Sequence, residues 1–140
     1  MPLHAFYAGY KQLDRRPDEL VTALRLPPPQ AGWVDHYRKV GTRRFQAISK
    51  TLLAARLKLD DAGNVEDVRL VLARVAPHTL RAVQTEDLLR GRPLTREAVS
   101  QAAEAVQDEI APIGDVRSNA RYRRRVTSNL IVDFLTPYAR

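Results

Sequence analysis

The order of hydrophobic patterns along the chain predicts an α+β fold: an antiparallel sheet of three to four strands with about three helices packed on one face. Two segments alternate apolar and polar residues with the period of a strand and are separated by a turn. Two later segments repeat apolar residues at helical spacing. Because strands come first and helices last, a sheet covered on one face by helices buries both kinds of apolar surface in the fewest layers.

The clearest element is a hairpin. In residues 55–59 every second residue is apolar and the residues between them are basic, and in residues 68–72 every second residue is apolar with Arg69 and Val71 between them. Residues 60–64, Asp-Asp-Ala-Gly-Asn, form the turn between the two segments. Residues 79–83 follow the strand breaker Pro77 and predict a third strand. We expect the inward positions of these strands to lie in the core.

Three helices complete the predicted domain. The first is short, with Thr85 as its N-cap and Gly91 at its end. The second runs from Thr95 to Ile110 with a stripe of small apolar residues suited to close packing on a sheet. The third begins near Ser118 and ends before Pro137, with an apolar side formed by Tyr122, Val126, Leu130, Ile131 and Phe134. The positions expected to be most buried are Leu57, Leu70, Leu72, Val99, Ala103, Val106, Ile110 and Phe134.

The N-terminal part is predicted to be a separate segment, residues 1–30, preceding the α+β domain at residues 31–140. Residues 20–26 form an apolar run of strand length that three prolines, residues 27–29, bring to an end. Residues 3–16 have no clear period and indicate an ordered loop or a tail. The conformation of residues 33–49 stays open, because an extended chain and a helix over its second half are both allowed.

Composition indicates a globular protein, with 44% hydrophobic and 28% charged residues. The chain has no apolar run of the ~20 residues that span a bilayer and no signal-peptide pattern, so we expect a cytoplasmic protein that does not enter a membrane. There is no cysteine, and the three histidines are scattered singly, which argues against a structural metal site. The net charge of +7 suits nucleic acid or an acidic partner, although a solvated basic face is the more ordinary interpretation.

Motifs of a self-sufficient enzyme are absent from the sequence: there is no glycine-rich phosphate loop, nucleophile elbow or histidine pair. His36, beside Tyr37 and Lys39, could transfer protons, but a lone histidine next to aromatics is more often a packing residue. The basic run at residues 121–125 could bind phosphates. On a helix, however, these arginines point in all directions, and we interpret them as stems along a helix flank.

The most specific pattern lies at residues 37–50, Tyr-Arg-Lys-Val-Gly-Thr-Arg-Arg-Phe-Gln-Ala-Ile-Ser-Lys. It resembles the motif that opens the C-terminal domain of the medium, FAD-binding subunit of the molybdenum hydroxylases, the xanthine dehydrogenase and carbon monoxide dehydrogenase family. The resemblance covers roughly residues 33–135, and residues 6–27 are similar to the end of the flavin domain that precedes it in that family. Further matching segments are residues 67–70, 75–77, 89–94, 115–118 and 122–124.

The resemblance implies a role next to FAD. Lys39 matches a lysine near the isoalloxazine ring, where its ammonium could stabilise negative charge on the reduced ring, and Tyr37 would share its face. Val21 and Leu24 could offer apolar contacts to the ring. In such enzymes iron–sulfur clusters pass electrons through FAD to an acceptor, and the cofactor carries the redox chemistry.

The implied partners are an N-terminal FAD-binding domain and the iron–sulfur and molybdopterin subunits of the same complex. Because the glycine-rich loops that hold the FAD pyrophosphate are missing, we do not expect this chain to hold FAD alone. Two alternatives stay open. One is a small basic nucleic-acid-binding module, supported only by charge and the arginine run, and the other is a subunit-assembly domain without a cofactor role.

Overall fold

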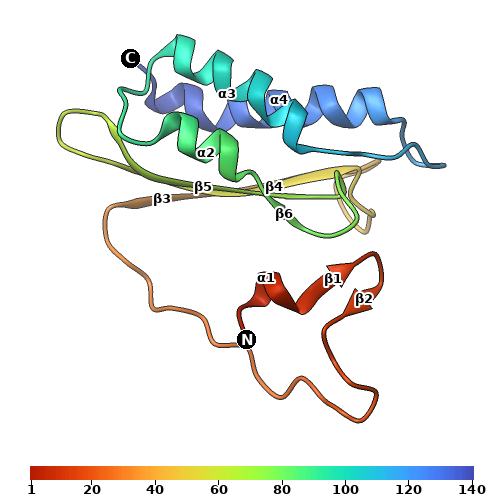
Figure 1. Cartoon of the computed structure of the whole chain (residues 1–140). Helices are drawn as coiled ribbons and strands as arrows, with labels where there is room; N and C mark the ends of the chain where they lie inside the picture. The colour runs from red at the N-terminus through yellow and green to blue at the C-terminus, as the bar shows by residue number, and fades with distance from the viewer. The chain divides into compact units, whose positions relative to one another are not determined.

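The structure is a computed structural model that describes residues 1–140, except for the side chain of His4. The chain divides into two compact units, Met1–Ala31 and Gly32–Arg140. The first unit, where the sequence indicated a loop or tail, holds a short helix and a small antiparallel hairpin (Figure 1): α1 (Leu3–Phe6), β1 (Tyr7–Gly9) and β2 (Gln12–Leu13).

The strand predicted at residues 20–26 is wrong, because this run has no regular secondary structure. Its large side chains Leu20, Val21, Leu24 and Leu26 are all exposed. An extended segment becomes a strand only where a neighbour satisfies its backbone N–H and C=O groups. Within the first unit β1 and β2 pair with each other, and neither pairs with this run.

The second unit is built on a four-stranded antiparallel sheet in the order β3-β4-β5-β6. The predicted hairpin is its centre, and residues 33–40, whose conformation the sequence left open, form the strand beside it. Residues 42–49, for which a helix was the other possibility, are not helical. The strands are β3 (Trp33–Val40), β4 (Thr51–Leu59), β5 (Val65–Ala73) and β6 (Leu80–Arg81).

Three helices cover one face of this sheet (Figure 1), which confirms the predicted α+β architecture. The second helix begins where the sequence indicated, and the Thr95 side chain caps it by accepting from the Ala98 N–H at 3.1 Å. Among the described residues no helix is both long and apolar enough to cross a membrane. The helices are α2 (Val83–Leu89), α3 (Arg96–Glu109) and α4 (Ala120–Leu135), followed by the 3₁₀ turn η1 (Thr136–Tyr138).

The predicted start of the first helix is wrong. α2 begins at Val83 rather than after Thr85, and Thr85 is buried within it. Its N-terminal N–H groups are satisfied from another helix: the carboxylate of Glu109, the last residue of α3, accepts from the backbone N–H groups of Gln84 at 2.9 Å and Thr85 at 2.7 Å. A cap supplied from 24 residues away leaves no local sequence pattern.

The core lies between the sheet and the helices. Every second residue of β4 from Thr51 to Leu57 is buried, as a strand with one covered face requires. All eight positions predicted to be the most buried lie in the core, which confirms that part of the pattern: Leu57, Leu70, Leu72, Val99, Ala103, Val106, Ile110 and Phe134.

One side of α4 differs from the prediction. Tyr122, expected on the apolar side, is 40% exposed, while Arg123 is only 4% exposed and begins a buried row that continues through Thr127 and Ile131. Arg123 donates to the backbone oxygen of Arg74 and pairs with Asp115, both at 2.8 Å. A buried charge needs such partners, and they come from two loops outside the helix, of which the loop with Arg74 is distant in sequence.

Candidate functional site

The sheet of the second unit has a second face, opposite α2, α3 and α4, which we call the open face (Figure 1). Its centre is made of small or aliphatic side chains, because Ala54 lies opposite Val71 and Leu52 lies opposite Ala73 in neighbouring strands. These four side chains are half-buried. They form a flat apolar floor on which a planar group can lie close to the backbone.

Tyr37 and Lys39 stand beside this floor on β3, two residues apart and therefore on the same side of the sheet. Tyr37 lies opposite Ala54 and Lys39 lies opposite Leu52. Tyr37 is 64% exposed, and Lys39 is exposed as well. The strand that the sequence left undecided thus brings these two predicted site residues together.

The charge of Lys39 is not used inside the domain. The ion pairs on this face include Arg56–Asp35 at 2.9 Å, Lys58–Glu66 at 2.5 Å and Arg69–Asp67 at 3.3 Å, and among the side chains that the structure describes none pairs with Lys39. An exposed ammonium at the border of an apolar floor attracts an anionic group that lies on that floor. The arrangement can therefore hold a planar, partly anionic ligand.

A second basic group at the end of the open face escaped the sequence reasoning. The guanidinium carbon of Arg56 lies 4.4 Å from the centroid of the Trp33 ring, and that of Arg69 lies 5.7 Å from it. Arg56 and Arg69 are directly opposite each other in the hairpin. Their alternation with apolar residues was visible in the sequence, but the register that joins them to Trp33 was not. Cation–π contacts offset the repulsion between the two arginines.

A further arginine of the sheet, Arg81, lies opposite Val71 at the β6 edge. Arg81 donates to the buried carboxylate of Glu86 through Nε at 2.9 Å and through its terminal nitrogen at 2.6 Å. These hydrogen bonds raise the pKa of Arg81. The charge of Arg81 is therefore paired with Glu86 of α2, whereas Lys39 has no ion pair among the described side chains.

The other two predicted site residues, Val21 and Leu24, belong to the first unit. They are 58% and 69% exposed and lie in the segment without regular structure. Their assignment rests on the family resemblance and stays a prediction. Only Tyr37 and Lys39 share an element of the structure.

His36 lies on the opposite side of β3 from Tyr37 and Lys39. Its ring is 5.1 Å from the ring of Phe134 in α4, centroid to centroid, and packs against it at a tilt. Of the two interpretations that the sequence allowed, the structure favours packing. His36 faces the helices and not the open face.

Comparisons with known proteins agree with the resemblance found in the sequence. Residues 36–138 match the family model described as CO dehydrogenase flavoprotein C-terminal domain. The glyceraldehyde dehydrogenase medium chain of Sulfolobus acidocaldarius is 31% identical over 126 residues, which are 89% of this chain and 43% of that protein. The xanthine dehydrogenase of Emericella nidulans is 28% identical over 139 residues, 96% of this chain and 10% of that protein.

The fold matches as well. A carbon monoxide dehydrogenase structure from Hydrogenophaga pseudoflava superposes with a TM-score of 0.86 and 26% identity, over 98% of this chain and 48% of that one. The chain thus spans less than half the length of these relatives. Because the family model covers most of the chain and the residues of its opening motif lie on β3 and the loop after it, the chain belongs to the family of CO dehydrogenase flavoprotein C-terminal domains.

Proposed function

We propose that this chain is the C-terminal domain of the FAD-binding subunit of a molybdenum hydroxylase of the xanthine or carbon monoxide dehydrogenase type, and that its open face forms one wall of the flavin site. The single observation that carries the proposal is the position of Lys39, exposed and without an ion pair among the described side chains, at the border of the apolar floor. In the parent enzyme, electrons from iron–sulfur clusters would pass through FAD to an acceptor.

The residues of the open face fit an isoalloxazine ring in shape and charge. Ala54 and Ala73 are short enough to let a flat ring approach the sheet, and Leu52 and Val71 give it apolar contact. Tyr37 adds an aromatic side chain next to Ala54. The ammonium of Lys39 complements the negative charge that a reduced ring carries.

When bound, FAD would supply the electron transfer itself. The chain's own residues would orient and tune it. The floor would exclude water from one side of the ring, and Lys39 would raise the affinity of the ring for electrons by stabilising its negative charge. Val21 and Leu24 would contribute apolar contact from the N-terminal segment.

The remaining parts of the enzyme would lie outside these 140 residues. The sequence has no glycine-rich loop for the FAD pyrophosphate, so an FAD-binding domain would have to hold most of the cofactor. Iron–sulfur and molybdopterin subunits would complete the electron path. We expect the whole complex to lie in the cytoplasm. The likeness to medium chains of dehydrogenases supports these partners.

The test is the flavin midpoint potential of the parent FAD subunit carrying Lys39→Ala. A unit charge ~4 Å from an anionic ring contributes up to ~4 kcal/mol at an effective dielectric of ~20, and solvent around an exposed lysine reduces this to roughly a third. Because ~1.4 kcal/mol corresponds to ~30 mV for a two-electron couple, we expect the potential to fall by tens of millivolts. Lys39→Arg keeps the charge and should change it less.

A matched control is Lys58→Ala on the same face. Lys58 lies six residues along β4 from Leu52, the partner of Lys39, which is ~20 Å at the rise of a strand. Its removal should leave the potential unchanged. Substrate oxidation at molybdenum, followed with a dye that bypasses the flavin, should not change in any variant. An unaltered potential in Lys39→Ala with full FAD content would contradict the proposal.

A further inference from the structure

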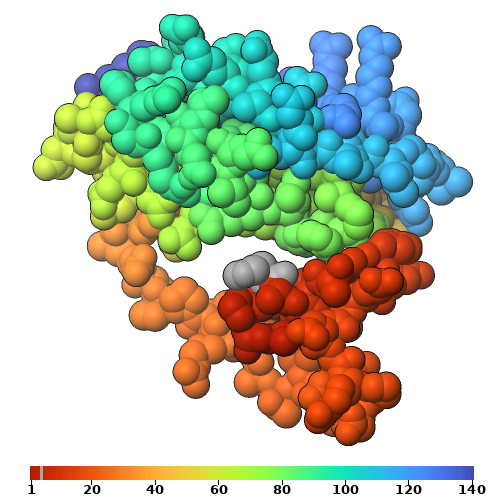
Figure 2. Space-filling view, in the orientation of Figure 1, coloured from red at the N-terminus to blue at the C-terminus, as the bar shows by residue number. Residues whose placement is uncertain are grey.

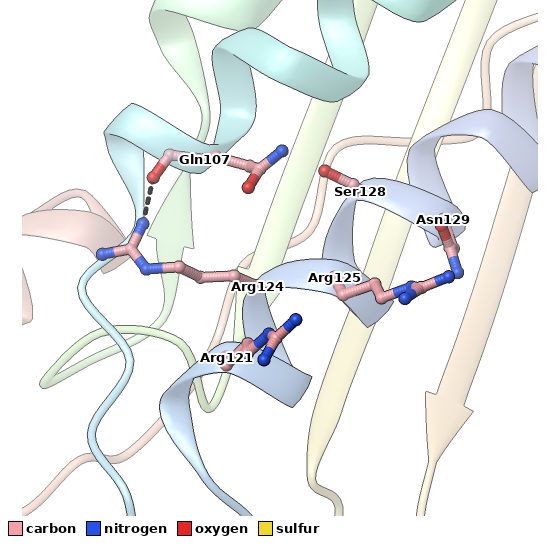
Figure 3. A pocket seen from close by; sticks show the side chains of 6 residues that line it. All are labelled: Gln107, Arg121, Arg124, Arg125, Ser128 and Asn129. Carbon is pink, nitrogen blue, oxygen red and sulfur yellow. Dashed lines mark hydrogen bonds between the residues drawn. The ribbon is translucent and has the colours of Figure 1, made fainter.

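A groove runs between α3 and α4 in the helical layer, and the function proposed above does not use it (Figure 3). It has a volume of about 600 Å³ and is open to solvent. In the space-filling view, side chains from the first half of α4 stand out from the surface next to it (Figure 2). The residues that line it are Gln107, Arg121, Arg124, Arg125, Ser128 and Asn129.

The groove is strongly basic. Three of its lining residues are arginines and none is acidic. Arg124 donates to the backbone oxygen of Gln107 (Figure 3). Among the arginines of α4 that the structure describes, the one that pairs with a carboxylate is the buried Arg123, whose partner is Asp115. The guanidiniums of Arg121 and Arg125 thus face solvent without a counter-charge.

This arrangement weakens the helix that carries it. Arg121 and Arg125 are four residues apart, so their like charges lie on one side of α4 and repel each other. The first turn of α4 contains Arg121 and no acidic residue, although the positive end of the helix dipole favours acidic groups there. A bound carboxylate would remove both unfavourable terms.

The groove continues along the helices with a different character. A second hollow of about 480 Å³ shares Gln107, Ser128 and Asn129 with the first and extends toward the C-terminal end of α4. Its walls include the apolar side chains of Val99, Ala103 and Val132, of which Val132 is exposed. The combined groove is therefore basic at one end and partly apolar at the other.

We infer that the α3–α4 groove docks an amphipathic helical segment of an acidic partner protein. Its carboxylates would lie against Arg121, Arg124 and Arg125, and its apolar side chains would lie toward the exposed Val132. Helices bind grooves between helices in this way, with anchors at helical spacing. Charge complementarity sets the orientation of the segment. This inference goes beyond the proposed function and does not depend on it.

Nucleic acid fits the groove less well. Glu104 lines the second hollow and would repel a phosphate backbone that follows the groove. Binding of a single strand also uses exposed aromatic rings as stacking platforms. Neither hollow has an aromatic residue in its lining, and the nearby Tyr122 already has Lys50 over its ring, with Nζ 5.1 Å from the centroid.

The test uses the whole chain and a fluorescent synthetic helix of about 18 residues, or five turns, with glutamates on one face of its first half and leucines on the same face of its second half. Fluorescence anisotropy should report saturable binding. The double variant Arg121→Ala/Arg125→Ala should weaken it by about tenfold or more. Arg38→Ala/Arg92→Ala removes the same charge from exposed positions outside the groove and should change the affinity less than about twofold.

Further arms separate the alternatives. The same helix with glutamines in place of its glutamates should bind at least about tenfold more weakly, and inorganic phosphate at millimolar concentration should compete poorly. The inference is overturned if the helix does not bind saturably, if both double variants bind it equally, or if the glutamine helix binds as well. It is also overturned if an oligothymidylate of similar length binds more tightly and loses its affinity in the Arg121/Arg125 variant.

Discussion

At the scale of single residues, a buried carboxylate organises the edge of the sheet. Glu86 is fully buried and accepts from the backbone N–H of Leu70 at 2.8 Å. The same carboxylate accepts from Arg81 at 2.6 Å and from Arg90 at 2.8 Å. Four charge-assisted or backbone donors thus satisfy one negative charge, which ties α2 to β5 and β6.

Glu86→Gln should therefore destabilise the fold by on the order of 2–3 kcal/mol. Breaking a fully buried ion pair costs ~3–5 kcal/mol, and the partial exposure of Arg81 and Arg90 reduces that figure. The matched control is the neighbouring Asp87→Asn, because Asp87 pairs with Arg90 at the surface and such pairs contribute less than ~1 kcal/mol. Urea unfolding of both variants measures the difference, and equal midpoints would show that the Glu86 network adds little.

At the scale of secondary structure elements, α3 and its continuation link the helical layer to the sheet. The helix ends at Glu109, whose carboxylate caps α2, and the next residue, Ile110, is 2% exposed in the core. Beyond it the backbone N–H of Ala111 donates to the oxygen of Val75 at 2.9 Å. Three interactions thus fix the end of α3: the hydrogen bonds of Glu109 to the start of α2, the burial of Ile110, and the backbone hydrogen bond of Ala111.

Two isoleucine-to-alanine substitutions test how much the burial of Ile110 stabilises the fold. Ile110→Ala should lower the free energy of unfolding by ~2–5 kcal/mol, because it opens a cavity in a packed core. Ile113→Ala, three residues later and 74% exposed, should change it by less than ~0.5 kcal/mol. Thermal unfolding followed by circular dichroism compares them. Similar melting temperatures would mean that the end of α3 does not pack as the structure has it.

At the scale of the whole molecule, the second unit presents two surfaces of different chemistry on opposite sides. The open face of the sheet combines an apolar floor with the free charge of Lys39, and the outer side of the helices carries the basic groove. Part of the net charge of +7 is therefore concentrated rather than evenly spread. In the two proposals made above, the open face would contact the cofactor and the groove would contact another protein at the same time.

The whole chain, purified alone, should be colourless and should bind FAD weakly or not at all. The physical reason is the lack of a loop whose backbone N–H groups could hold the pyrophosphate, the part of FAD with the highest charge. Gel filtration of the chain with one equivalent of FAD, read by flavin absorbance in the protein peak, measures this. A yellow protein peak would mean that these 140 residues contain a complete site.

The sequence by itself determined the elements whose period is local. The hairpin of β4 and β5, the α3 helix, and the eight predicted core positions follow from alternation and helical spacing within short windows. The family motif also predicted Tyr37 and Lys39 as site residues, and this assignment stays a prediction. Their shared face needed only an extended backbone, because alternate residues of any strand point the same way.

Only the tertiary structure decided features that depend on partners distant in the chain. The burial of Arg123 requires Arg74 and Asp115, the start of α2 requires Glu109, and the apolar run at residues 20–26 stays irregular because neither strand of its unit pairs with it. The groove between α3 and α4 likewise exists only where two helices meet. Local periodicity shows which face of an element is apolar. The hydrogen-bond partners and counter-charges of its polar groups, however, lie on residues that only the folded chain brings near.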